Sequence, residues 1–248
     1  MKAQRARRFW LVTLAAAVGV LATASLGVWQ LGRAANKRAW LAERAAQAAL
    51  PTADWDALRD AQARGQLSAW AGRTVRLQGR WVAPATVWLD NRPMEGRAGF
   101  VVVTPLLPDG GGPAVLVQRG WVARRPDDRQ AIPALATPEG PVTVEGRLAP
   151  PPSQLFQLGP DAPGPIRQNI RLDAFATEWR LTLLPMSVQQ TAPPDTAVDG
   201  TPLRRAWATV AVEPAKHVGY AVQWFGLAAL ISALYVWFQF LSPRRRAS

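Results

Sequence analysis

The residues with the richest chemistry gather where the second of two long apolar runs begins. His217, Tyr220 and Trp224 are spaced so that a helix would place all three side chains on one face. Gln223 lies in the same stretch and adds an amide. An imidazole in such a setting can bind a metal centre. The simpler interpretation is that His217, beside Lys216, contacts lipid headgroups.

Two further polar or aromatic residues, Trp29 and Gln30, close the first apolar run. If both runs cross the same membrane, these side chains lie at the same depth as His217. Aromatic and apolar neighbours suit a haem macrocycle, and arginines nearby suit its propionates. The functional hypothesis is therefore that His217 is an axial ligand to the iron of a haem lying between the two helices.

Other kinds of chemistry find little support. The chain has no cysteine, which excludes disulfides, thiolate nucleophiles and Cys-ligated metal centres. His217 is the single histidine, and its place at the membrane boundary argues against a Ser–His–Asp triad. Carboxylates are plentiful, but no pair stands out as an acid–base couple. The run 109–112 (DGGG) joins two predicted strands and lacks the lysine of a phosphate-binding loop, so it predicts a hairpin turn.

The elements that must position these residues are two predicted transmembrane helices. Residues 9–31 and 218–241 contain no charged side chain, and each is long enough to cross a hydrocarbon core of about 30 Å. The first run is preceded by basic residues and contains Ala22-Thr23-Ala24, so a cleaved signal peptide is the competing interpretation. An uncleaved anchor is favoured because the apolar run continues to Leu31.

Charge gives an orientation for these helices. The formal net charge is +12, and both short tails are purely basic, which predicts that both termini are cytoplasmic and that the intervening domain lies outside. The rest of the positive charge is dispersed, without a basic helix or an aromatic RNA-binding motif, so no nucleic-acid partner is expected. Membrane lipid is the expected surrounding of both runs.

Between the runs the sequence predicts a mainly antiparallel β domain, barrel- or sandwich-like. The predicted organisation is a basic tail (1–8), a transmembrane helix (9–31), juxtamembrane helices (32–65), a soluble β domain (66–216), a second transmembrane helix (217–241) and a basic tail (242–248). Short helices are predicted at 54–64, capped by Asp54 or Thr52, and at 172–179. Alternating or apolar segments predict strands at 73–82, 86–90, 99–104, 114–122, 141–148, 154–158, 181–190 and 207–213.

Several compact motifs, taken in order, resemble the surfeit-locus family of cytochrome c oxidase assembly factors. They are WQLGR (29–33), LDNR (89–92), RGWV (119–122) and HVGYAVQWF (217–225), and the resemblance runs over residues 25–246. The family's first motif usually continues with Trp-Lys, where this chain has Asn36-Lys37 and then Trp40.

The resemblance implies a non-enzymatic assembly factor of a bacterial inner membrane, with its β domain in the periplasm. Such proteins are thought to help haem a reach the catalytic subunit of a haem–copper oxidase, and haem a synthase is a further possible partner. By motif position, His217 matches the proposed ligand to the haem iron, and its neighbours in the site are Trp29, Gln30, Tyr220, Gln223 and Trp224. Gly120 is implied to serve the fold. The alternatives are a scaffold that holds no haem and, more remotely, a membrane-anchored hydrolase.

Overall fold

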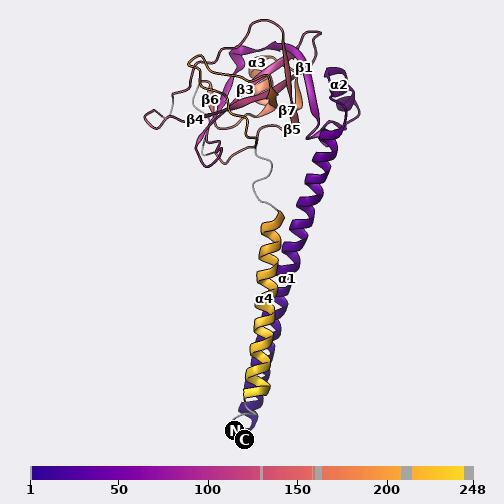
Figure 1. The fold of residues 1–248 in the computed structure, drawn as a ribbon, viewed down its shortest axis with the longest axis vertical. Helices are drawn as coiled ribbons and strands as arrows, with labels where there is room; N and C mark the ends of the chain where they lie inside the picture. The colour runs from indigo at the N-terminus through magenta and orange to yellow at the C-terminus, as the bar shows by residue number, and fades with distance from the viewer. Residues whose placement is uncertain (1, 129–130, 158, 160–163, 208–213, 243–248) are drawn as a thin grey trace. The chain divides into compact units, whose positions relative to one another are not determined.

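The computed structural model describes the whole chain except residues 1, 129–130, 158, 160–163, 208–213 and 243–248. The chain divides into two compact units, one of residues Met1–Ala42 and Val210–Ser248 and one of residues Glu43–Thr209. The first is helical and the second is built around a β-sheet (Figure 1).

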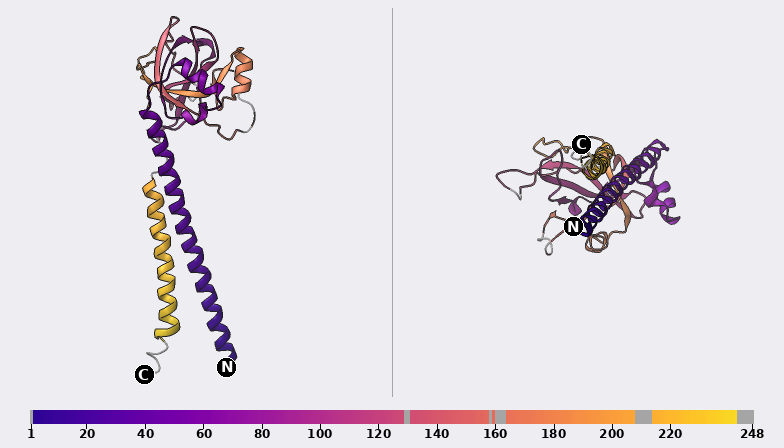
Figure 2. Two further views of the ribbon diagram at one scale, coloured as in Figure 1. Left: turned by 90° about the vertical axis from the view of Figure 1, so that its right-hand side faces the viewer. Right: turned by 90° about the horizontal axis from the view of Figure 1, so that it is seen from below.

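The helical unit contains helix α4 (Pro214–Val236) and most of helix α1 (Lys2–Ala49). The two helices run side by side in opposite directions (Figures 1 and 2), and a π-helical turn, η3 (Trp237–Leu241), extends α4. Both are long and apolar enough to cross a membrane, and only 6% of each apolar stretch is buried within the protein. Most of the apolar surface therefore depends on lipid for cover, as expected of a membrane protein.

The β domain begins with helix α2 (Trp55–Ala63). Asp54 caps it as predicted, because its carboxylate accepts a hydrogen bond from the Ala57 N–H over 3.0 Å. A short 3-10 turn follows, η1 (Leu67–Trp70), and another, η2 (Ala83–Ala85), lies between the first two strands. Helix α3 (Leu172–Trp179) covers the range predicted for it.

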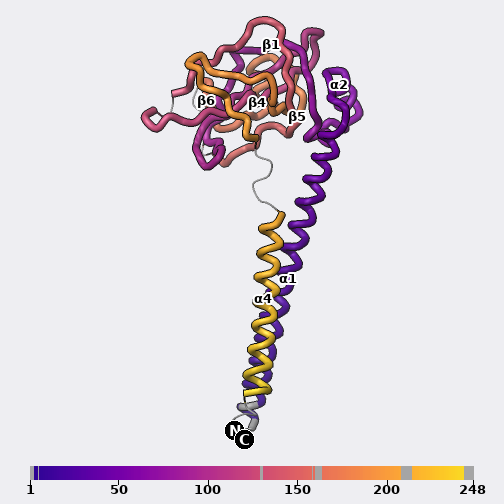
Figure 3. The backbone as a smooth tube through the Cα atoms, viewed as in Figure 1, coloured from indigo at the N-terminus to yellow at the C-terminus, as the bar shows by residue number. Residues whose placement is uncertain are grey.

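Seven strands form the sheet: β1 (Thr74–Trp81), β2 (Val87–Leu89), β3 (Gly99–Pro108), β4 (Ala114–Ala123), β5 (Val142–Ala149), β6 (Ile166–Arg167) and β7 (Leu183–Ala192). Their order is β1-β5-β7-β4-β3-β2-β6, and β1 also pairs with β3. Five strands therefore close into a ring, β1-β5-β7-β4-β3. Figure 3 traces the backbone of this domain and labels β1, β4, β5 and β6 in it. All pairings are antiparallel except β4 with β7 and β2 with β6. The prediction of a mainly antiparallel, barrel-like domain is confirmed.

The barrel is filled by the alternating side chains of its strands. The largest buried cluster includes Val75 and Leu77 of β1, Val117 of β4 and Leu148 of β5, and α2 adds Trp55 and Leu58 to it. The indole N–H of Trp55 donates to the Gln78 carbonyl over 2.6 Å, which ties α2 to β1. A second cluster holds Phe175 of α3 against β2. The short helices thus cover apolar residues that the strands leave open.

One predicted strand is absent from the structure, and another lies almost entirely outside the described residues. The segment 154–157 is not a strand, because the Asn169 side chain takes over its pairing: it accepts from the Leu155 N–H over 2.7 Å and donates to the Leu155 carbonyl over 2.9 Å. An amide side chain can substitute for a neighbouring strand in this way. The predicted strand at 207–213 falls almost entirely on residues outside those described, and Trp207 is not in a strand.

Barrel closure depends on a close approach at Gly79. Gly79 pairs with Pro108 where β1 meets β3, and a Cβ atom placed there would collide with the Leu107 carbonyl oxygen. Gly120 is similarly confined, since its Cβ would stand 2.6 Å from the Leu203 Cβ. This agrees with the structural role expected of Gly120.

We predict that Gly79→Ala lowers the thermal stability of the β domain. Forcing a methyl group into this contact should cost about 1–3 kcal/mol, or several degrees in melting temperature for a domain of this size. Circular dichroism of the full chain in detergent measures the shift. Gly110→Ala is the matched control, because its Cβ meets nothing within 4 Å. Equal melting temperatures for the two variants would contradict the closure role of Gly79.

Candidate functional site

The two long helices pack through one narrow face each. On α4 the half-buried or buried residues recur at alternating spacings of four and three: His217, Ala221, Trp224, Ala228, Ile231 and Tyr235. The same spacing on α1 runs through Thr13, Ala16, Val20, Thr23, Gly27, Gln30 and Ala34. This is the pattern of a left-handed helix pair with small residues at the contact. We call this contact the seam.

Small residues let the helices approach closely at the centre of the seam. A Cβ placed on Gly27 would lie 2.7 Å from the Phe225 Cζ, so the Phe225 ring rests directly against the α1 backbone. A Cβ on Gly19 would lie 3.4 Å from the Ile231 Cδ1. These contacts fix both the spacing of the helices and their antiparallel register.

Two side-chain hydrogen bonds join the helices across the seam. The Gln30 Oε1 lies 2.8 Å from the His217 Nδ1, and the Thr13 hydroxyl lies 2.8 Å from the Tyr235 hydroxyl. Along α1 the two sites are about 26 Å apart, nearly the thickness of a hydrocarbon core. One polar contact therefore stands near each end of the span.

The contact with Gln30 engages one nitrogen of the His217 ring. The amide oxygen can only accept a hydrogen bond, so this contact suits a ring that is protonated at Nδ1. No residue of the described part of the chain forms a hydrogen bond with the other ring nitrogen, Nε2. His217 itself is half-buried at the seam. A neutral imidazole with an open Nε2 is a metal-ligand form of histidine.

The structure brings only part of the predicted site into the seam. Trp224 is half-buried and lies about 20° around the helix from His217, whereas Tyr220 lies about 60° away and is 52% exposed. Gln223 is exposed and lies about 120° away, so it does not share the His217 face. Trp29 is 53% exposed and its ring is covered by Arg33, whose Cζ is 5.4 Å from the ring centroid.

Sequence reasoning missed the residues that hold this arrangement. Gly27 and Phe225, and the pair Thr13–Tyr235, are as much a part of the seam as Gln30 and His217. The signal was present as small residues repeating every three or four positions on both runs. Pairing them, however, requires the register of the two helices, which neither run contains alone.

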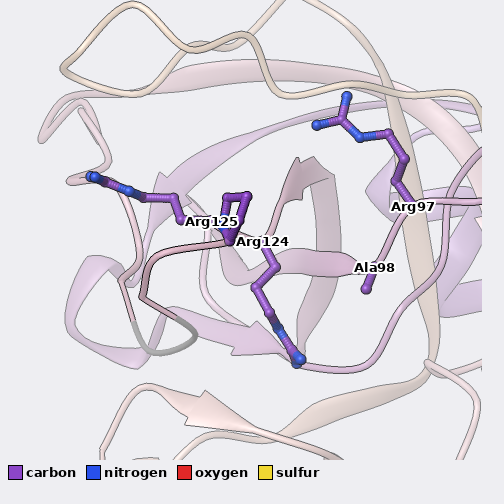
Figure 4. Close-up of a pocket in the computed structure, with 5 residues that line it drawn as sticks. Arg97, Ala98, Arg124 and Arg125 are labelled. Atoms are coloured by element: carbon purple, nitrogen blue, oxygen red, sulfur yellow. The ribbon is translucent and has the colours of Figure 1, made fainter.

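The β domain has a basic pocket of about 500 Å³ lined by Arg97, Ala98, Arg124, Arg125 and Pro126. Its arginines point in different directions (Figure 4). Arg124 pairs with Asp90, and Arg125 pairs with Asp127 over 2.8 Å. No group of three or more His, Asp or Glu that could hold a metal occurs in the part of the chain that the structure describes. The pocket offers positive charge but no acid–base pair.

The most buried charges of the β domain serve its own architecture. The pairing of β3 with β4 shifts between Val102 and Val103, which leaves Arg119 as the extra residue of a β-bulge. Its side chain is 1% exposed and forms a salt bridge of 2.7 Å with Asp195. Burial lowers the pKa of Arg119, and the Asp195 charge opposes that shift. The Arg205 Nε–H donates to the Arg119 carbonyl over 2.7 Å, so the segment before α4 is tied to the bulge.

The seam, its histidine–amide contact and the closed ring of strands define a class of protein: a membrane protein with two long apolar helices that carries a β-barrel domain. A family model described as the SURF1 family matches residues 17–229, most of the chain, and the chain belongs to this family. The family is generally linked to cytochrome oxidase assembly rather than to a catalysed reaction. A comparison with individually curated proteins finds no match.

We predict that Gly27 sets the approach of the two helices. In a chain that has no other cysteine, Gly19→Cys with Ile231→Cys should form a cross-link on oxidation, because the two positions face each other across the seam. Adding Gly27→Val should reduce the cross-linked fraction severalfold, since its side chain has to displace the Phe225 ring that lies there. The cross-link is measured by electrophoresis under non-reducing conditions.

The matched control is Gly226→Val in the same double-cysteine chain. A Cβ on Gly226 meets nothing within 4 Å, so cross-linking should be unchanged. If Gly27→Val and Gly226→Val cross-link alike, the close approach at Gly27 does not set the seam.

Proposed function

We propose that this chain assists the binding of haem a and its insertion into the catalytic subunit of a haem–copper oxidase, with His217 as the axial ligand to the haem iron. The observation that carries the proposal is the state of His217: Nδ1 is held by Gln30, and Nε2 has no partner among the residues described. Membership of a family linked to cytochrome oxidase assembly supports the same function.

The residues around His217 fit such a group. The chain supplies one strong ligand, because it has no second histidine and no cysteine. Trp224 shares the His217 face, and the exposed rings of Tyr220 and Trp29 offer apolar surface to a macrocycle. Arg33 and Lys216 supply positive charge for propionates at this end of the helices. When bound, haem a supplies the iron and macrocycle that the oxidase uses for electron transfer.

In this function the chain holds the haem, orients the His217 ring that binds it and shields the site from water. The seam holds Nδ1 of the imidazole against Gln30 and leaves the other ring nitrogen without a partner among the described residues, and the apolar helices limit the access of water. A protein with a single strong ligand can pass its cargo on, because one bond has to be exchanged rather than two. Gln223 faces away from His217 and suits contact with the oxidase subunit or with haem a synthase better than contact with the same haem.

The location that suits this function is a bacterial inner membrane. The basic tails favour cytoplasmic termini, and this orientation supports a periplasmic β domain. The second candidate function is a scaffold that stabilises an oxidase subunit during assembly and holds no haem. The favouring observation is the β domain itself, whose buried charges serve its architecture and which presents an exposed basic pocket.

We predict that His217→Ala abolishes or shifts a haem a spectrum. The full chain is co-expressed with a haem a synthesis pathway, purified in detergent and measured by absorption beside the variant. Ser232→Ala is the control on the same helix, since Ser232 only donates to the Ala228 carbonyl and should leave the spectrum unchanged.

A folded parent protein that carries no haem would contradict the carrier function. If His217→Ala also leaves oxidase assembly intact in cells, the scaffold function replaces it. A spectrum of the same intensity and position in the parent and in His217→Ala would show that another residue binds the iron.

A further inference from the structure

The side chain of Gln30 has a more specific part than that of a neighbour to the haem site. We infer that Gln30 is a positioning residue that holds the neutral His217 ring in the tautomer protonated at Nδ1, so that Nε2 is the ligating atom. The tautomer follows from the seam alone, whereas its consequence for haem rests on the function proposed above.

The geometry of the contact allows one assignment of the proton. The Gln30 Oε1 and the His217 Nδ1 are 2.8 Å apart, an ordinary hydrogen-bond length. Because an amide oxygen has no proton to give, the ring must donate through Nδ1. A hydrogen bond at one imidazole nitrogen decides which tautomer is present and which nitrogen is free to bind a metal.

Gln30 is held in place by its own surroundings. It is half-buried at the seam, between Gly27, where the Phe225 ring lies against the backbone, and Ala34, which is 1% exposed. An amide in an apolar helix pair has few other partners, since lipid offers none. The contact with His217 therefore satisfies both side chains at once.

The group that faces the His217 Nδ1, the side-chain amide of Gln30, carries no charge. Neither α1 from residue 9 to 42 nor α4 contains an aspartate or glutamate, so among the described residues of these two helices the acceptor that meets His217 is an uncharged amide. A carboxylate partner raises the basicity of a ligating imidazole more strongly than an amide does. Gln30 thus orients the ring while leaving Nε2 a weaker ligand, which suits a protein that must release its cargo.

The experiment uses the single histidine of the chain as its own label. The full-length protein, with ¹⁵N in the histidine ring and an affinity tag that lacks histidine, is prepared haem-free in detergent at an alkaline pH where the ring is neutral. Two-bond ¹H–¹⁵N correlation spectra then report one imidazole. We expect the Nδ1 resonance to be that of a protonated nitrogen and the Nε2 resonance that of an unprotonated one.

Two substitutions separate orientation from folding. Gln30→Leu removes the acceptor but suits an apolar seam, and it should shift the ring toward the Nε2-protonated tautomer. Gln30→Glu keeps an acceptor oxygen and should retain the Nδ1-protonated form. The cross-link between Gly19→Cys and Ile231→Cys, formed as in the parent, shows that the helices still pair in each variant. A parent ring protonated at Nε2, or identical spectra for the parent and Gln30→Leu, would overturn the inference.

A titration of the same three proteins with haemin, followed by absorption, tests the consequence for ligation. Loss of a second-shell partner typically weakens a metal site by about 10–100-fold, so Gln30→Leu should bind haemin at least about tenfold more weakly, and Gln30→Glu at least as tightly as the parent. If the tautomer is as expected but none of the proteins binds haemin, the proposed function fails and the role of Gln30 in the seam stands. If the parent and Gln30→Leu bind haemin equally, the positioning role fails and the proposed function stands.

Discussion

A polar side chain on a membrane helix finds few hydrogen-bond partners outside the protein, because hydrocarbon offers none and only the headgroup region does. In this chain the constraint acts near both ends of the helix pair, through Gln30 with His217 and Thr13 with Tyr235. Each contact forms only if the two helices lie in one register, and the register in turn requires Gly27 to accept the Phe225 ring. The polar contacts and the close packing therefore depend on each other, and the contact at the Nδ1 of His217 follows from both.

The β domain also has to pair its polar backbone groups, and it does so by closing its strands into a ring. A ring of five strands leaves few backbone groups unpaired, and closure between β1 and β3 is possible because Gly79 has no side chain. The bulge at Arg119 then turns one charged side chain into the interior, where Asp195 and the Thr137 hydroxyl receive it. A buried pair of this kind adds little net stability, but it specifies which loops lie against the barrel. The domain's charges are thus explained by its architecture without assigning them to catalysis.

The features that were predicted correctly depend on residues that lie close together in the sequence. The helix at 172–179 and the Asp54 cap follow from capping and periodicity within a few residues, and most strands follow from their alternation. Barrel closure and the parallel pairing of β4 with β7 join residues far apart in the chain, so no short pattern contains them. The segment 154–157 looked like a strand because nothing local reveals that the Asn169 side chain will take its pairing.

The candidate site shows the same division between local and long-range information. The spacing of His217 and Trp224 placed both on one face from the sequence alone, and the shared depth of Gln30 and His217 followed from two apolar runs crossing one membrane. That the amide meets Nδ1 rather than Nε2 depends on the register of one helix against the other, which the sequence does not state.

A single histidine between two helices is a weak place to store a haem and a suitable place to hold one briefly. Proteins that keep their haem commonly use two strong ligands or enclose the macrocycle. This helix pair offers one imidazole, held by the uncharged amide of Gln30, and aromatic rings that are half exposed. Because these rings are half exposed, another protein has room to approach a haem bound at this site. If His217 is the ligand as proposed, the thin seam is an advantage for transfer, because the receiving subunit can compete for the iron without unfolding the donor.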